Sequence, residues 1–315
     1  MTVGMKSLVA EQNVSVIPAT KGERFIFQTV DAGDTWQDIS MGLPHDVQDG
    51  RLFVSGQQVI FKAENGLFHT AINSSTAVWK EAVILDQKIP YVFPGLNALY
   101  GYNPASGFFK EMQGSGIWMP LGNTLGGKVV NDFVETADGV IVIASPSGIF
   151  KSIDGCKTWK HVFIDSWVSD IIATDGFMYA GGANGMWRSV DGGEHWEMIK
   201  RDMGDVYQLT SIDGGLAAIF TGDPSASKGS KSQVMISYDK GMTWQPIDQN
   251  LRAGKYIYDF EKAGDYLFCS KDTGVYRSAD NGKTWELVRP SKDKERVELA
   301  ISGKTVYAVL SWGGC

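Results

Sequence analysis

The chain has 315 residues and a net charge of −7, from 29 basic and 36 acidic residues. This balance gives no chain-wide positive charge, so DNA and RNA are not expected as partners. No apolar stretch approaches the roughly 18 residues of a membrane-spanning helix, and residues 1–12, MTVGMKSLVAEQ, lack the apolar core of a signal peptide, although a leader could have been removed.

The composition favours a β-rich protein without a disulfide framework. Glycine occurs 37 times beside 10 Trp, 11 Tyr and 15 Phe, which indicates many turns and large packing side chains. The cysteines, Cys156, Cys269 and Cys315, are odd in number and widely spaced, and the 4 histidines share no metal-ligand spacing. We therefore expect no metal site and no cofactor, and the cysteines leave the compartment open.

Tryptophan recurs along the chain at separations of 37 to 48 residues. Such a fixed period is the signature of a repeat architecture. Seven units of this length account for nearly the whole chain. Their tryptophans are Trp36, Trp79, Trp118, Trp159, Trp196, Trp244 and Trp285.

Two adjacent units, residues 129–163 and 168–199, show what each repeat contains. Their first strand is NDFVET or SDIIAT, their second VIVIAS or FMYAGG, and their third GIFKS or GMWRS, with a fourth beginning at the tryptophan. Apolar alternation with Gly and Asp between the segments is typical of a four-stranded antiparallel meander.

Two other units keep the tryptophan but lose the turn residues. Residues 107–118 align without a gap to residues 148–159, with Glu111 at the position of Ser152. Residues 66–79 need two extra residues and have lost both Asp and Gly. We expect the packing tryptophan to remain in these units without the turn chemistry.

These repeats predict an all-β fold, a single seven-bladed β-propeller over residues 1–315 with four-stranded antiparallel blades. The ring must be closed by pairing of N- and C-terminal strands. Residues 296–312, RVELAISGKTVYAVLSW, offer a first strand for pairing with residues 13–20 and 24–29. Because this C-terminal segment holds two candidate strands, the sequence leaves the exact closure open.

A motif between the third and fourth strands carries a family resemblance. It is complete in SYDKGMTW, residues 237–244, and SADNGKTW, residues 278–285, and recurs with single changes at residues 29–36, 152–159 and 189–196. It resembles the Asp-box, or BNR, repeat of sialidases, xyloglucanases, sortilin-type receptors and the photosystem II assembly factor family.

The box is interpreted as a structural turn. Its Asp and Ser oxygens can bond backbone groups, its Gly can adopt positive φ, and its Trp can fill space between sheets. The resemblance implies that the boxes lie on the face away from the binding site. The residues assigned this role are Asp31, Asp154, Asp191, Asp239, Asp280, Trp36, Trp159, Trp196, Trp244 and Trp285.

The opposite face should carry the connections from strand four to the next strand one and from strand two to strand three. Aromatic and polar residues on these loops suit sugars and peptides alike. The candidate ligand-binding residues are Trp167, Tyr207, Tyr256, Tyr258, Arg201 and Arg252. The long segment 221–233, rich in Gly, Ser and Lys, is either a mobile flap or an ordinary insertion.

Acidic residues recur where strand one begins, at Asp132, Asp170 and Asp259, with Gln208 and Glu298 at matching places. They predict a partial acidic ring along the axial channel. It could bind a cation or a basic side chain, or its oxygens could accept backbone hydrogen bonds between blades. Both alternatives stay open.

Hydrolysis of a glycosidic bond would need two flanking carboxylates. The candidates by location are Asp165, Asp170, Asp202, Asp205 and Asp259. Resemblance to sialidases also implies three converging arginines and an Arg-Ile-Pro near the first blade, where this chain offers Lys88-Ile89-Pro90 in another blade. The xyloglucanases it resembles contain two propellers, and this chain accounts for one.

The leading hypothesis is a non-catalytic binding or assembly propeller, a monomer that presents its loop face to a protein or glycan ligand. The alternative is a glycoside hydrolase that uses carboxylates on the same face. The resemblance favours a secreted or periplasmic location if a leader was removed. The sequence shows no general basic patch for an anionic partner, and the basic residues of the loop face cluster in the last three loops: Lys200, Arg201, Arg252, Lys255, Arg289, Lys292, Lys294 and Arg296.

Overall fold

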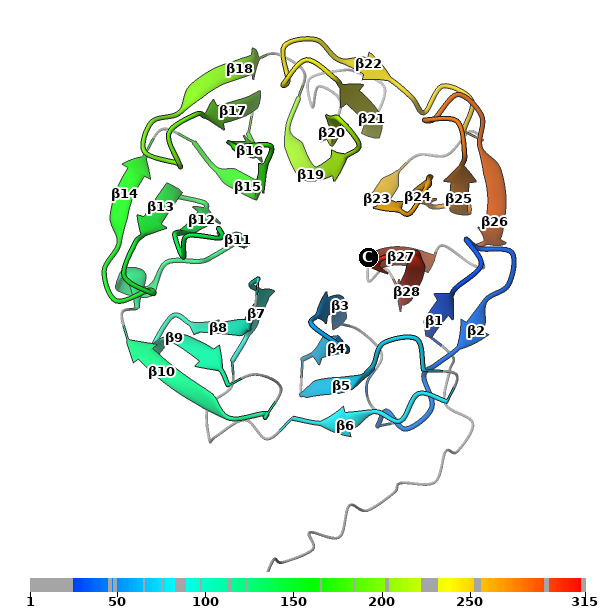
Figure 1. The fold of residues 1–315 in the computed structure, drawn as a ribbon, viewed down its shortest axis with the longest axis horizontal. Helices are drawn as coiled ribbons and strands as arrows, with labels where there is room; N and C mark the ends of the chain where they lie inside the picture. Colours follow the sequence, from blue (N-terminus) through cyan, green and yellow to red (C-terminus); the bar gives the residue numbers. More distant parts are fainter. Residues whose placement is uncertain are drawn as a thin grey trace, which may run out of the picture.

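The computed structural model describes residues 25–312 apart from 45–46, 48–49, 65, 75, 83–88, 97, 113–114, 123, 165, 184, 202–203, 222–231, 252–255 and 292–294. Seven antiparallel sheets of four strands each form a closed ring (Figure 1). The fold is therefore the predicted seven-bladed β-propeller. In Figure 1 the first strand of each blade lies nearest the axis and the fourth lies at the rim.

Blade 1 joins the two ends of the chain. It consists of β27 (Glu295–Ser302), β28 (Thr305–Trp312), β1 (Ile26–Thr29) and β2 (Gln37–Asp38). Ile26 pairs with Val309, and the Leu310 N–H donates to the Phe25 carbonyl at 2.8 Å. Both candidate strands of the C-terminal segment thus belong to this blade, which answers the question of closure that the sequence left open. Residues 13–20 lie outside the described residues.

The other blades follow chain order. Blade 2 consists of β3 (Gly50–Ser55), β4 (Gln58–Ala63), β5 (Leu67–Ala71) and β6 (Lys80–Glu81). Blade 3 consists of β7 (Tyr91–Pro94), β8 (Leu99–Asn103), β9 (Gly107–Glu111) and β10 (Trp118–Gly122). Blade 4 consists of β11 (Asp132–Glu135), β12 (Ile141–Ser145), β13 (Gly148–Ser152) and β14 (Lys160–Phe163). Blade 5 consists of β15 (Val168–Thr174), β16 (Phe177–Gly182), β17 (Gly185–Ser189) and β18 (Glu197–Arg201). Blade 6 consists of β19 (Val206–Ile212), β20 (Gly215–Thr221), β21 (Ser232–Ser237) and β22 (Gln245–Pro246). Blade 7 consists of β23 (Ile257–Ala263), β24 (Tyr266–Lys271), β25 (Gly274–Ser278) and β26 (Glu286–Pro290).

The core lies between blades. Every residue of β12 is buried, because side chains on both faces of its sheet meet a neighbouring blade. One apolar cluster, for example, joins Val142 and Ile149 of blade 4 to Ile171 and Met178 of blade 5. A helical turn, η1 (Leu125–Gly127), follows β10, and no helix in the described part of the chain is long and apolar enough to cross a membrane.

The two atypical blades keep their packing tryptophan, as expected. Trp79 and Trp118 are buried, and the Trp79 indole N–H donates to the Ile39 carbonyl of blade 1 at 2.6 Å. In blade 3 the Glu111 carboxylate accepts the Gly116 N–H at 3.0 Å. It thus accepts a backbone N–H of the turn, as the serine does in the boxes.

A glycine in each complete box approaches the preceding blade closely. Gly282 has φ +82°, and a Cβ built on it would lie 2.6 Å from Cβ of Ile247. Gly241 has φ +85° and the same kind of contact with Ile199. A side chain at these positions would meet both backbone strain and a neighbouring blade.

Gly282→Ala should therefore destabilise the fold more than Gly214→Ala, a turn position with φ +66° and open space around it. The left-handed backbone alone costs about 1 kcal/mol in either variant, and the collision with Ile247 adds about 1–3 kcal/mol. Urea unfolding followed by tryptophan fluorescence measures both. Equal losses in the two variants would contradict the inter-blade contact.

Candidate functional site

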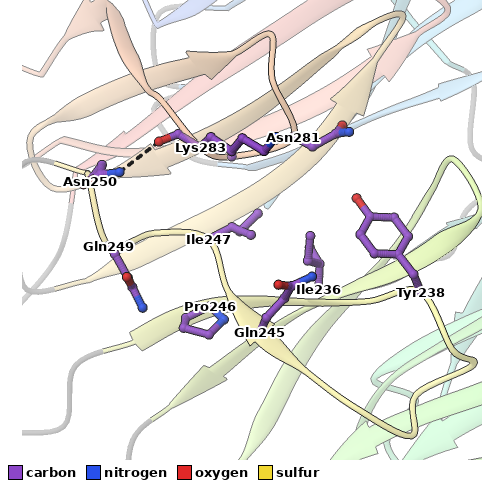
Figure 2. A pocket seen from close by; sticks show the side chains of 10 residues that line it. Ile236, Tyr238, Gln245, Pro246, Ile247, Gln249, Asn250, Asn281 and Lys283 are labelled. Carbon is purple, nitrogen blue, oxygen red and sulfur yellow. Dashed lines mark hydrogen bonds between the residues drawn. The ribbon is translucent and has the colours of Figure 1, made fainter.

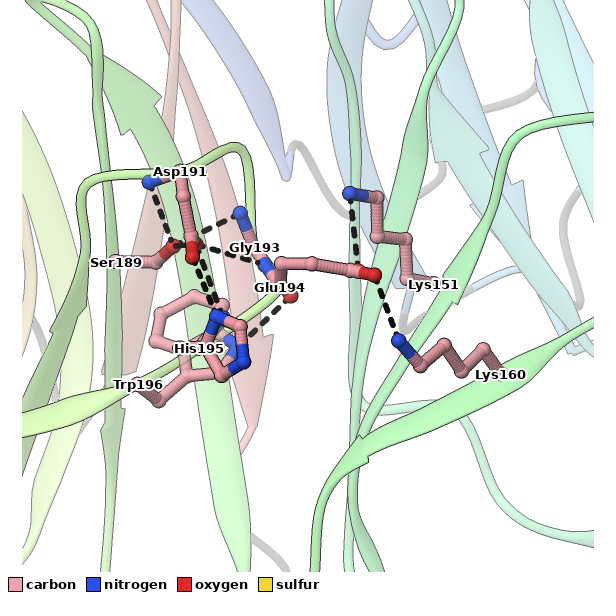
Figure 3. A network of polar contacts seen from close by, with 8 residues as sticks. All are labelled: Lys151, Lys160, Ser189, Asp191, Gly193, Glu194, His195 and Trp196. Atoms are coloured by element: carbon pink, nitrogen blue, oxygen red, sulfur yellow. Dashed lines mark hydrogen bonds and ion pairs between the residues drawn. The ribbon is translucent and has the colours of Figure 1, made fainter.

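The Asp-box turns form a regular hydrogen-bond network around one carboxylate. In blade 5 the Ser189 hydroxyl donates to Asp191 at 2.8 Å and accepts the Gly193 N–H at 2.8 Å (Figure 3). Asp191 also accepts the His195 N–H at 2.9 Å and contacts the His195 ring nitrogen at 2.6 Å. His195 replaces the usual threonine, whose hydroxyl makes the corresponding bond at 2.6 Å in the box of Asp280.

These donors stabilise the ionised aspartate. Hydrogen bonds from the side chain and backbone of Thr284 lower the pKa of Asp280 to about 2, and the corresponding threonines do the same for Asp31, Asp154 and Asp239. The backbone and ring of His195 lower the pKa of Asp191 further. Each box carboxylate is thus held by its own turn.

The box tryptophans lie partly buried against the apolar clusters. The indole N–H groups of Trp196 and Trp244 donate to the carbonyls of Gly193 and Gly241 in their own turns. That of Trp285 also reaches Ile247 of the preceding blade at 2.8 Å. Trp36 and Trp159 pack against clusters that include the preceding blade.

The acidic residues of strand one bond the backbone of the next blade. Asp132 accepts the Ile171 N–H at 2.9 Å and Asp170 accepts the Leu209 N–H at 2.5 Å. In the same way, Gln208 accepts the Phe260 N–H at 3.3 Å and Asp259 accepts the Leu299 N–H at 2.7 Å. The inter-blade alternative therefore describes these side chains, and the chain of bonds runs from blade 4 to blade 1.

A β-bulge precedes three of these four acceptors. The pairing register shifts between Val168 and Asp170, between Val206 and Gln208, and between Ile257 and Asp259. A bulge bends its strand and redirects side chains. Here it leaves an extra residue at the loop-face end of each strand, and in blades 6 and 7 that residue is Tyr207 or Tyr258.

Burial raises the pKa of Asp259 to about 6, against the opposing effect of its bonds from Leu299 and Gln208. Burial and the neighbouring Asp132 carboxyl also raise the pKa of Asp170. Within the described residues, no three His, Cys, Asp or Glu side chains gather as a metal site would require.

An aromatic cluster lies on the loop face where β23 and β27 begin, and we call Tyr256, Tyr258 and Arg296 the loop-face cluster. The two tyrosine rings stack with centroids 6.4 Å apart and an interplanar angle of 22°. The Arg296 guanidinium lies 5.9 Å from the Tyr258 ring centroid and pairs with Glu298 at 3.0 Å. Tyr256 is 45% exposed, so part of this residue is accessible to solvent.

The other ligand-binding candidates lie apart from this cluster. Trp167, 55% exposed, stands before β15, and Arg201 ends β18 with its Nε 3.1 Å from the Met198 sulfur. Tyr207 is partly buried, and its hydroxyl donates to the Ile257 carbonyl. Arg252 lies outside the described residues.

The catalytic candidates do not form a described carboxylate pair. Asp165 and Asp202 lie outside the described residues, as does most of the segment 221–233. Asp170 and Asp259 bond backbone amides of neighbouring blades. The Asp205 carbonyl accepts the Thr221 N–H at 2.8 Å. Catalysis by any of these residues stays a prediction.

The comparisons with known proteins agree with this geometry. A model of the BNR/Asp-box repeat matches residues 276–287, which span the box of blade 7. The chain thus has the fold of a seven-bladed β-propeller, and its blade 7 carries a BNR/Asp-box repeat. No curated protein matches it in sequence.

Several solved structures share the fold of this chain. An ancestral GH74 enzyme superposes with a TM-score of 0.62 at 15% identity, over 89% of this chain and 44% of that one. YCF48 bound to D1 peptide gives 0.61 at 13% identity, over 94% and 100% of the two chains. YCF48 from Cyanidioschyzon merolae gives 0.60 at 14%, over 84% and 97%. This propeller thus spans less than half of the GH74 enzyme.

Sequence reasoning missed one column of the propeller. The position is the residue directly before the first residue of the box, a serine or threonine. In four of the five blades that carry a box, its side chain reaches the turn of the next blade, and in blade 6 it is an isoleucine, Ile236. The aligned repeats contain this signal, although its meaning depends on the contacts described below.

Asp259→Asn should lower the free energy of unfolding by about 1–3 kcal/mol near pH 8. Its two oxygens accept N–H groups of Leu299, Phe260 and Gln208, and an amide leaves at least one of these donors facing an NH₂ group. Urea unfolding measures the loss. Asp213→Asn, whose side chain is 87% exposed, is the matched control and should stay within about 0.5 kcal/mol of the wild type. A wild-type stability for Asp259→Asn would contradict the inter-blade role.

The box of blade 7 should make stability depend on acid. Because the folded pKa of Asp280 is about 2, below that of an unfolded aspartate, its contribution is present above about pH 4 and is lost as the pH falls toward about 2. Asp280→Asn removes this titration, so its free energy of unfolding should fall less across that interval. Urea titrations at several pH values measure both slopes, with Asp213→Asn as control. Parallel curves for wild type and Asp280→Asn would refute the linkage.

Proposed function

We propose that the chain is a non-catalytic binding propeller whose loop-face cluster holds a segment of a protein partner. The carrying observation is the stacked pair Tyr256 and Tyr258 with Arg296 beside it, partly open to solvent. Aromatic and arginine side chains are the residues that most often dominate the binding energy of protein interfaces.

The backbone beneath the cluster is held in place. The Ile257 N–H donates to the Ser232 hydroxyl at 3.2 Å, and the Ile257 carbonyl accepts the Tyr207 hydroxyl. The Asp272 N–H contacts the Tyr256 carbonyl at 3.4 Å. A binding surface that is already ordered loses less conformational entropy when a ligand arrives.

A protein ligand is supported further by YCF48, a propeller matched over its whole length whose solved structure contains a bound D1 peptide. Tyrosine faces and a guanidinium suit an extended peptide with an apolar or aromatic residue. The proposed ligand is therefore a protein segment. A glycan that binds the same aromatic side chains is the alternative ligand.

Glycoside hydrolysis is the second candidate function, because GH74 enzymes share the fold. The described carboxylates offer it little support, since Asp170 and Asp259 are engaged by backbone amides. Asp205 is the described catalytic candidate whose carboxylate does not take part in the hydrogen bonds from strand one to the backbone of the next blade.

Tyr256→Ala should weaken peptide binding by at least about tenfold, because it removes the exposed aromatic face. A phage-displayed library of random linear peptides is panned on the purified chain, and each selected peptide is titrated by calorimetry. Val190→Ala is the control, because Val190 is 64% exposed and lies in the box turn of blade 5, apart from the loop-face cluster. We expect a class of peptides that loses affinity with Tyr256→Ala and keeps it with Val190→Ala.

A panel of aryl glycosides and polysaccharides distinguishes the second function. Turnover that disappears in Asp205→Asn would overturn the non-catalytic proposal in favour of hydrolysis. If every selected peptide is insensitive to Tyr256→Ala, the loop-face cluster is not the binding site.

A further inference from the structure

In four blades, the residue before the box serine or threonine reaches the turn of the next blade. Arg188 donates to the Lys240 carbonyl at 3.0 Å, and Arg277 to the Ala32 carbonyl at 2.8 Å. Gln28 donates to the Ser74 carbonyl at 2.8 Å. Lys151 pairs with Glu194 at 3.3 Å (Figure 3). We call these side chains the inter-blade arms.

Each arginine arm is neutralised by a glutamate opposite it on strand four. Arg188 pairs with Glu197, and Arg277 pairs with Glu286 at 2.7 Å. The same two positions in blade 6 are Ile236 and Gln245, which also pair with each other in register. Blade 6 therefore has neither the arm nor its counter-charge.

A pocket of about 430 Å³ lies where this arm is missing, between blade 6 and the box turn of blade 7 (Figure 2). Its apolar part is formed by Ile236 and Ile247, which are 3% and 7% exposed, and by Pro246. Tyr238 and Gln245 also line it.

The box turn of blade 7 presents two further groups to this pocket. Asn281 corresponds to Ala32 and Lys240, with φ 56° against 57° and 62°, and those two carbonyls receive the arginine arms. No described side chain donates to the Asn281 carbonyl. Lys283 lines the pocket, and Figure 2 shows its side chain running toward Asn281.

We propose that this pocket binds a glutamate side chain of a partner peptide. Among the described lining residues, Lys283 is the one that carries a charge, so the pocket favours an anion. An arginine of a partner would find no carboxylate among these residues to pair with. The Asn281 carbonyl can accept a backbone N–H of the same peptide.

The shape of the lining selects a glutamate over an acidic sugar. Ile236, Pro246 and Ile247 give an apolar floor for the methylene groups of a glutamate, whereas a hexuronate would place hydroxyl groups there. The amide of Gln245 can donate a second hydrogen bond to the carboxylate. This site is independent of the loop-face cluster and lies on the face that the box motif was expected to leave without function.

The isoleucines of the pocket are direct probes of occupancy. The protein is labelled at isoleucine δ1 methyl groups and titrated with acetyl-Ala-Glu-Ala-amide. The Ile236 and Ile247 signals should shift saturably with a dissociation constant of about 10 mM or below. Acetyl-Ala-Gln-Ala-amide, which lacks the charge, should bind at least about tenfold more weakly.

Two variants test the assigned chemistry. Lys283→Met keeps the stem and removes the charge, so it should lose about tenfold in affinity for the glutamate peptide. The double variant Ile236→Arg with Gln245→Glu rebuilds the arm of blades 5 and 7, so it should abolish the Ile247 shift while keeping the melting temperature of the wild type. Val190→Ala, at the position of Tyr238 in the box of blade 5, is the control and should bind the glutamate peptide unchanged.

Four results would overturn this proposal: no saturable shift, equal shifts with the glutamine peptide, full binding by Lys283→Met, or tighter binding of glucuronate than of the glutamate peptide. The last would assign the pocket to an acidic sugar. Each of these leaves the outcome of the Tyr256→Ala test unaffected, so the two sites succeed or fail separately.

Discussion

Each blade of this propeller is a sheet with two apolar faces, and neither face can be left in water. The buried pattern of β12 and the clusters shared by adjacent blades show that a blade is stable as a member of a ring. A closed ring also removes the two end blades that an open array would expose. Pairing of β1 with β28 supplies this closure, because it builds one sheet from both ends of the chain. The bonds between strand-one residues and the contacts of the box glycines then act between neighbouring blades of the closed ring.

Two sets of aspartates serve this ring in opposite electrostatic environments. The box aspartates are accessible and surrounded by hydroxyl and amide donors, so their pKa values fall. The strand-one aspartates are buried between blades, and burial raises their pKa values even though they also accept backbone bonds. A carboxylate in such a position is explained by its hydrogen-bond partners, and its raised pKa is not by itself a sign of catalysis.

The sequence predicted most of the fold, because the fold repeats. Seven tryptophans at similar spacing and five recognisable boxes gave the number of blades, the strand order and the face on which the boxes lie. The candidate site was predicted less well. Asp170 and Asp259 were placed correctly near the start of strand one, but residue types left a cation and a backbone amide open as partners. The packing of adjacent blades decides between them, and that packing cannot be predicted from residue types alone. Asp165, Asp202 and Arg252 lie outside the described residues, so their roles stay predictions.

Repetition also makes a departure from the pattern informative. A single isoleucine in a strand has no meaning by itself, and Ile236 would pass as an ordinary buried side chain. Among the five blades that carry a box, the other residues at this position are Gln28, Lys151, Arg188 and Arg277, which bond across the blade interface, whereas Ile236 is apolar. Its cross-strand partner is Gln245 rather than a glutamate, so the charge that an arginine would need at this position is also missing. On the loop face, the proposed binding residues lie on connections that differ from blade to blade. On the box face, a pocket lies where blade 6 lacks the contact that its neighbours, blades 5 and 7, make.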